Sequence, residues 1–178
     1  MKQQDLKNIT ASLFFALTTL GCSMVSSALG MEITTVKSEL VNDVTLTSRY
    51  TGGDFSTASY SFKFLSHDLE ITDNNMDLIF EAREDFKDFF SVNMSVDDNS
   101  LIYDLGEKSC ATLSKAETDA SKLTPAITAE IKKGHCYLTD NNDESGRVVT
   151  VFHVAEHKKS FSVKINEIKV LKQVNLKN

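Results

Sequence analysis

The stretch that most constrains the fold runs from Arg147 to Ala155 and carries apolar side chains at most of its positions. Its β-branched and aromatic residues suit a pleated strand. Because successive side chains of a strand point to opposite faces, Val148 and Phe152 would lie on one face and Val149 and Val151 on the other. A strand that is apolar on both faces is typical of the middle of a covered sheet. We therefore predict a central strand here.

Two more strands are expected beside this central strand. Cys136 to Thr139 precedes it, and the residues from Asp140 to Gly146 between the two are turn formers. Phe161 to Val174 follows it after a short polar segment. The pattern predicts a three-stranded antiparallel meander at the end of the chain.

The last of these strands changes the phase of its alternation. Val163 and Ile165 fall on one face, whereas Ile168 and Val170 would fall on the other if the strand were regular. One extra residue in the strand restores a common face. We therefore predict a β-bulge near Asn166 and Glu167.

The upstream segments contain both strand and helix patterns. The segments Asp43–Tyr50 and Phe55–Leu65 alternate as strands, whereas Met76–Phe90 places its apolar residues at helical spacing. Between the cysteines, Ser114–Glu117 has the form of a capping box, and Thr124–Pro125 is typical of a helix start. Together these patterns predict an α+β domain. It would contain an antiparallel β-sheet or partly closed barrel, one longer helix and a disulfide-bounded helical insertion.

The first 30 residues have the pattern of a secretory signal peptide. A positively charged start precedes an apolar region, and small residues at Ala28 and Gly30 suit cleavage. Two alternatives remain, namely a lipid anchor on Cys22 and an uncleaved membrane anchor. We expect cleavage, a single domain over residues 31–178, no stable membrane span after cleavage, and a secreted or periplasmic location.

Two cysteines remain after cleavage, Cys110 and Cys136. In an oxidising compartment an isolated pair is most simply a disulfide. The absence of a Cys-x-x-Cys spacing argues against a redox pair or a thiolate metal site. The sequence therefore predicts a structural disulfide, which would stabilise the fold by about 3–4 kcal/mol in the chain-entropy model.

The segment His153-Val-Ala-Glu-His157 has the form of the H-x-x-E-H zinc signature of inverted zincin peptidases. That motif needs a helix, on which residues four apart are neighbours. On a strand the two histidines would lie about 13 Å apart and could not share one ion. We therefore expect no metal site and no cofactor, and His153 and His157 are the metal candidates of this motif. A calcium site of a type other than the EF-hand, formed by Asp140, Asn142, Asp143 or Glu144, is a further alternative.

Composition and motifs narrow the function without assigning it. The net charge of −6 and the lack of a basic stripe argue against nucleic-acid binding. No Gly-x-Ser-x-Gly elbow occurs, and no catalytic residue is assigned. The sequence favours an exported, non-enzymatic binding or interaction domain, with a protein partner in the envelope or outside the cell. The alternative is a small secreted or periplasmic hydrolase with a site assembled from dispersed Asp, Glu, His and Ser residues, so enzymatic activity stays open.

Overall fold

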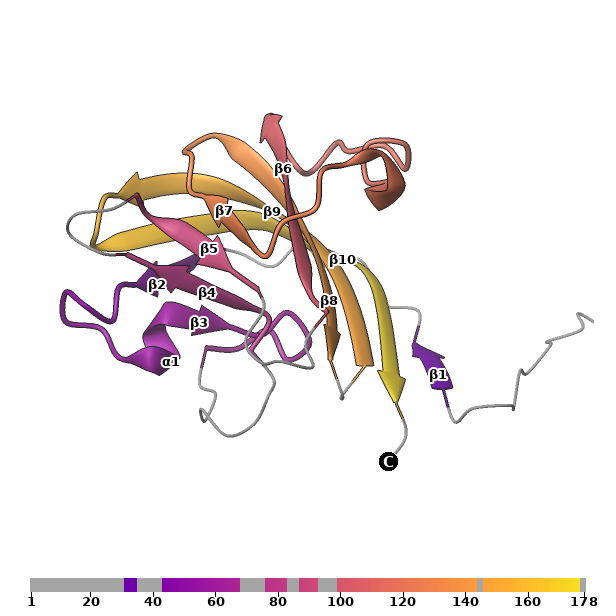
Figure 1. The fold of residues 1–178 in the computed structure, drawn as a ribbon, viewed down its shortest axis with the longest axis horizontal. Helices are drawn as coiled ribbons and strands as arrows, with labels where there is room; N and C mark the ends of the chain where they lie inside the picture. Colours follow the sequence, from indigo (N-terminus) through magenta and orange to yellow (C-terminus); the bar gives the residue numbers. More distant parts are fainter. Residues whose placement is uncertain are drawn as a thin grey trace, which may run out of the picture.

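The structure is a computed structural model. It describes residues 31–34, 43–67, 76–82, 87–92, 99–143 and 146–176. Its dominant feature is a group of three long strands, β8 (His135–Asp143), β9 (Gly146–Lys158) and β10 (Ser162–Leu176). They pair antiparallel in chain order and curve together (Figure 1). The predicted meander is confirmed, although β8 continues to Asp143 where the sequence indicated a turn from Asp140.

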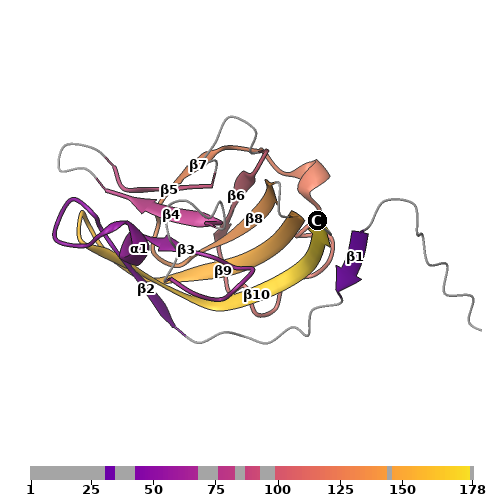
Figure 2. The ribbon, with the colours of Figure 1, turned by 90° about the horizontal axis from the view of Figure 1, so that it is seen from below.

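Three more strands complete the larger sheet. The strand β6 (Leu101–Glu107) pairs with β8, while β1 (Met31–Thr34) and β2 (Val44–Thr47) both pair with β10. A smaller antiparallel sheet follows the order β3 (Ser59–Tyr60), β4 (Leu78–Glu81), β5 (Phe89–Ser91) and β7 (Thr128–Glu130). This smaller sheet lies across one face of the larger one (Figure 2).

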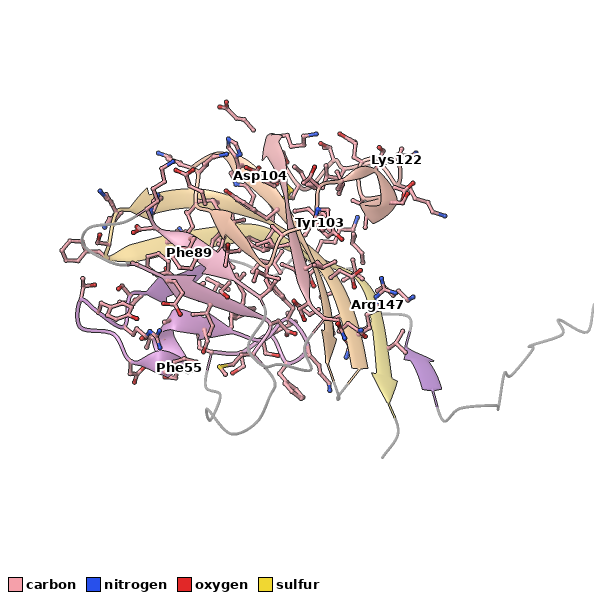
Figure 3. The ribbon with its side chains drawn as sticks, in the orientation of Figure 1. Phe55, Phe89, Tyr103, Asp104, Lys122 and Arg147 are labelled. Carbon is pink, nitrogen blue, oxygen red and sulfur yellow. A yellow bond between two sulfur atoms is a disulfide. The ribbon has the colours of Figure 1, made fainter. Side chains whose placement is uncertain are left out.

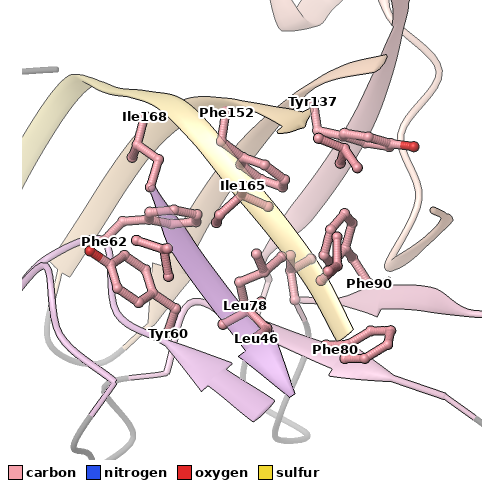
Figure 4. Close-up of a cluster of buried hydrophobic side chains, with 14 of the residues drawn as sticks. Leu46, Tyr60, Phe62, Leu78, Phe80, Phe90, Tyr137, Phe152, Ile165 and Ile168 are labelled. Atoms are coloured by element: carbon pink, nitrogen blue, oxygen red, sulfur yellow. The ribbon is translucent and has the colours of Figure 1, made fainter. Parts of the chain in front are cut away.

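The main core lies between the two sheets and is built around Phe152 of β9. The ring of Phe152 stacks on Phe62 and on Tyr137, with 5.6 Å between ring centroids in each case. It also meets the ring of Phe90 edge to face at 5.3 Å (Figure 4). Such stacked and edge-to-face pairs add to the gain from apolar burial. The central strand is therefore anchored to both sheets.

The opposite face of β9 is covered as well. Val151 packs with Leu138, Tyr103 and the two cysteines in a second core cluster. The loop between the cysteines covers this cluster and contributes Leu113, Ala120 and Leu123 to it. The prediction that Arg147–Ala155 forms a central strand covered on both faces is thus confirmed.

The pairing of β10 with β9 contains the predicted irregularity. The register shifts between Asn166 and Lys169, and Glu167 adopts a left-handed φ of 50°. As a result, Ile165 and Ile168 both lie in the main core, although they are an odd number of residues apart. The predicted bulge near Asn166 and Glu167 is confirmed.

The α+β assignment is wrong, because the described residues form two antiparallel sheets and contain no long helix. The predicted helix at Met76–Phe90 is replaced at both ends by the strands β4 and β5, which pair with Phe80 opposite Phe90. Their apolar residues are buried against the larger sheet. The apolar residues of these two short, paired strands are spaced along the sequence in a way that resembles the spacing of a helix.

The predicted helical insertion between the cysteines is also wrong. Glu117 does accept hydrogen bonds from the Ser114 N–H at 2.9 Å and hydroxyl at 2.8 Å. These bonds lower the pKa of Glu117 to about 2, and the bond from the backbone N–H has the larger effect. However, only turns and a short 3₁₀ helix, Ala120–Lys122, follow. After Thr124–Pro125 the chain is extended and forms β7, because pairing with β5 outweighs the local helix signals.

The segment Phe55–Leu65 is a strand over two residues only. Asp54 caps a short helix, α1 (Phe55–Ala58), by accepting from the Thr57 N–H at 2.8 Å. The chain then enters β3 and turns. Phe64, near the end of the predicted strand, is 54% exposed. Local capping by Asp54 therefore replaced the first half of the predicted strand.

Some predictions lie outside the described residues. These are the signal peptide over residues 1–30 and the lipid-anchor alternative at Cys22. Within the part of the chain that is described, no helix is long and apolar enough to cross a membrane.

The inner face of the larger sheet carries three buried polar side chains without hydrogen-bond partners among the described residues. Thr139 and Thr150 are directly opposite each other on β8 and β9, and both are fully buried. Among the described residues, no group hydrogen-bonds either hydroxyl, nor the side-chain amide of nearby Asn141. A buried polar group without a partner costs free energy relative to an apolar group of the same shape.

We predict that Thr139→Val raises the free energy of unfolding by about 1–2 kcal/mol, because it removes an unpartnered hydroxyl at nearly constant volume. Urea denaturation measures the change. Thr139→Ser is the matched control. It keeps the hydroxyl and loses a buried methyl group, so it should destabilise the fold. A valine variant less stable than the parent would contradict this view of the inner face.

Candidate functional site

An open groove of about 800 Å³ lies on the outer face of the larger sheet, beside the loop between the cysteines. We call it the outer groove. Its floor consists of Leu138 on β8, Val149 on β9 and Leu171 on β10. The segment Lys115–Ala120 of the loop forms its wall. Side chains of three consecutive strands thus meet one irregular segment at a single concave surface.

The disulfide fixes one end of the wall to the sheet. Cys110 and Cys136 are bonded, as the sequence predicted, with Cα atoms 5.5 Å apart, and both are buried. Cys136 precedes the floor residue Leu138 by two positions on β8. The loop therefore starts at a covalent attachment close to the groove floor.

Glu167 in the bulge of β10 provides a second attachment. Its carboxylate accepts hydrogen bonds from the Ser109 hydroxyl at 2.7 Å and from the N–H groups of Cys110 at 2.6 Å and Ala111 at 3.0 Å. Burial raises the pKa of Glu167, but these bonds and the nearby His153 outweigh burial and lower it overall. The charged form of Glu167 is thus the form that holds the loop.

The far end of the loop is held by backbone pairing. Ala126 and Ile102 exchange two backbone hydrogen bonds, of 2.8 and 3.1 Å. Between these ends, the 3₁₀ turn is capped by Asp119, whose side chain accepts from the Ser121 N–H at 3.2 Å. The wall therefore keeps a defined conformation although it has little regular secondary structure.

A charge pair lies at the rim of the groove. Asp140 on β8 accepts from Nε of Arg147 at 2.7 Å and from Nη2 at 2.5 Å. The aspartate side chain is 12% exposed and the arginine side chain 45% exposed. The pair lies near Tyr103, whose pKa is raised by burial and by the charge of Asp140. Figure 3 shows Arg147 on the larger sheet, Tyr103 on β6 and Lys122 on the loop between the cysteines.

Of the remaining charged groups of the groove, the negative one is paired and the positive ones are not. Asp119 is paired with Lys122 at 3.4 Å. Lys115 on the wall and Lys172 on β10 are exposed and have no ion-pair partner in the part of the chain that is described. The rim therefore presents free positive charge beside an apolar floor.

The histidine pair of the possible zinc motif lies on a strand. His153 contacts the Asn166 side chain at 2.9 Å, and His157 contacts the carboxylate of Asp88 at 2.7 Å. Since both residues lie on β9, the helix that the zinc motif requires is absent there. Among the described residues, no group of three or more His, Cys, Asp or Glu side chains is arranged to hold a metal ion.

A hydrolytic centre would need an activated nucleophile. Within the described ranges, no Ser, Thr or Cys side chain is hydrogen-bonded to a ring nitrogen of a histidine, and Nδ1 of His67 lies 3.3 Å from the backbone carbonyl of Ser59. His135 instead contacts Asp104 at 2.8 Å, and Lys132 also binds this carboxylate. Burial raises the pKa of Asp104, but the hydrogen bonds outweigh burial and lower it overall.

Sequence reasoning missed the residues that build the outer groove. Asp140 was assigned to a turn and Arg147 to the start of a strand. Their position on either side of a cluster of turn formers was the available signal, because residues on neighbouring strands of a hairpin can pair diagonally. Lys115 and Lys172 carried no such signal, because the loop brings them together from distant parts of the chain.

The fold and the groove define the chain as a two-sheet antiparallel β protein with a concave outer surface. No protein-family model matches it. Neither a curated protein nor a solved structure shows significant similarity to it.

We predict that Glu167→Gln destabilises the protein by about 1–2 kcal/mol at neutral pH, since it weakens three hydrogen bonds to a carboxylate. Because the folded pKa is lowered, this stability is present above the unfolded value of about 4.3 and is lost as pH falls through the folded pKa. Denaturation of both proteins from pH 7 to pH 3 measures it. The difference in the free energy of unfolding between the two proteins should disappear in acid. A difference that stays constant with pH would contradict the role of the charge on Glu167.

Proposed function

We propose that this chain is a non-enzymatic binding domain that takes an amphipathic ligand in the outer groove. The observation that supports this most is the groove itself, with its apolar floor and charged rim. Its volume of about 800 Å³ lies in the range of ordinary ligand pockets. Apolar surface supplies affinity in such sites, and a few polar groups supply orientation.

The groove is largely formed before any ligand arrives, which supports the proposal. Its floor belongs to the most extensively paired strands of the larger sheet. Its wall is held by the disulfide, by Glu167 and by pairing between Ala126 and Ile102. A preformed site avoids the entropy cost of ordering loops on binding.

We also propose that the domain works after export, in the periplasm or outside the cell. The disulfide supports this, since such bonds persist in oxidising compartments. The signal-like start of the sequence supports it too. A partner protein in that compartment is a natural source of ligand, because an extended segment with apolar side chains would fit an open groove.

The neutral dye N-phenyl-1-naphthylamine, whose fluorescence rises in apolar surroundings, tests the groove. We expect saturable binding to the parent protein and at least tenfold weaker binding to Leu171→Asp, which places a charge on the floor. Leu171 is 38% exposed, so the fold should tolerate the change.

Leu65→Asp is the matched control, because Leu65 is similarly exposed, at 43%, and lies outside the groove. It should bind the dye as the parent does. Absence of binding to the parent protein, or equal loss in both variants, would contradict a binding site in the outer groove.

A further inference from the structure

We infer that the ligand of the outer groove carries an anionic group, a carboxylate, phosphate or sulfonate, which Arg147, Lys115 and Lys172 bind. This inference rests on the function proposed above. The apolar body of the ligand would lie on Val149 and Leu171, with its charged end at the rim.

The geometry of Arg147 favours an anionic ligand. Asp140 occupies Nε and Nη2 of the guanidinium, so the remaining nitrogen, Nη1, has no hydrogen-bond partner among the described residues. Because Asp140 is mostly buried, it holds the planar group in one orientation. Arg147 therefore offers donors to an anion without first losing side-chain freedom. Asp140 acts here as a positioning residue.

The balance of charge carries the second part. The groove residues include three cations, Lys115, Arg147 and Lys172, and two carboxylates, Asp119 and Asp140, which gives 3 − 2 = +1. The whole chain carries −6. Both carboxylates are already paired, with Lys122 and Arg147. The unpaired charge that faces a ligand is thus positive on a protein that is otherwise acidic.

Lys115 and Lys172 differ from other lysines without an ion pair among the described residues, such as Lys133 and Lys159, by their place at the groove. Five other lysines in the described ranges form ion pairs with carboxylates. Lys115 and Lys172 approach the same groove from its wall and from β10 without such partners there. Two free ammonium groups beside an apolar floor select a ligand that combines negative charge with apolar surface.

A pair of dyes that differ by one sulfonate tests the inference. 1-Anilinonaphthalene-8-sulfonate carries the anion, and N-phenyl-1-naphthylamine lacks it. We expect the parent protein to bind the sulfonate dye at least about tenfold more tightly than the neutral one, with a preference that falls as salt rises. Decanoate should displace the sulfonate dye, whereas decanol should compete much less well. Decyl phosphate as a third competitor separates a phosphate ligand from a carboxylate.

Lys115→Met/Lys172→Met is the decisive variant, because it breaks no ion pair among the described residues. It should reduce the preference to about two- to threefold by weakening the binding of the sulfonate dye. Arg147→Met/Asp140→Asn should act in the same direction, and its second substitution avoids leaving a buried carboxylate unpaired. The control is Lys133→Met/Lys159→Met, which removes two exposed lysines outside the groove and should retain the parent preference.

The two proposals fail in different ways. Equal affinity of the parent for both dyes, or a preference that survives in both groove variants, would overturn the anion inference and leave the groove as a binding site. Failure of the neutral dye to bind the parent protein would overturn the proposed function itself.

Discussion

The pairing of β9 with β10, with its register shift between Asn166 and Lys169, is the interaction on which the rest of the structure depends. Because of this shift, the side chains of Ile165 and Ile168 both point into the main core. It also leaves Glu167 on the outer side, where its carboxylate holds the start of the loop between the cysteines. One irregularity in one strand therefore completes the main core and fixes the wall of the outer groove.

The two faces of β9 have different roles. Phe152 joins the two sheets on the inner face, and its aromatic contacts define how they pack. Val151 lies on the outer face, beneath a loop with little regular structure of its own. A loop of this kind needs anchors, and the disulfide, Glu167 and the Ala126–Ile102 pairing supply them. The groove exists because that loop stands beside the sheet in a fixed position.

The sequence was most informative where local pattern and tertiary role coincide. A strand that is buried on both faces, as at Val151 and Phe152, has apolar residues at consecutive positions. A bulge, as at Glu167, changes the phase of the apolar alternation. The predicted helix at Met76–Phe90 was wrong because β4 and β5 are buried by pairing with each other, and their combined spacing imitated a helix. The groove left almost no signal, since its lysines and the Asp140–Arg147 pair meet only through hairpin register and the loop.

The most direct test of this account is amide hydrogen exchange of the oxidised protein beside the Cys110→Ala/Cys136→Ala variant. We expect that loop amides with backbone hydrogen bonds, among them those of Lys122, Leu123 and Ala126, lose most of their protection in the variant. The amides of β8, β9 and β10 should stay strongly protected, since their pairing does not pass through the disulfide. Unchanged protection of the loop, or equal loss in the three strands, would contradict a groove wall anchored by the disulfide on an independently stable sheet.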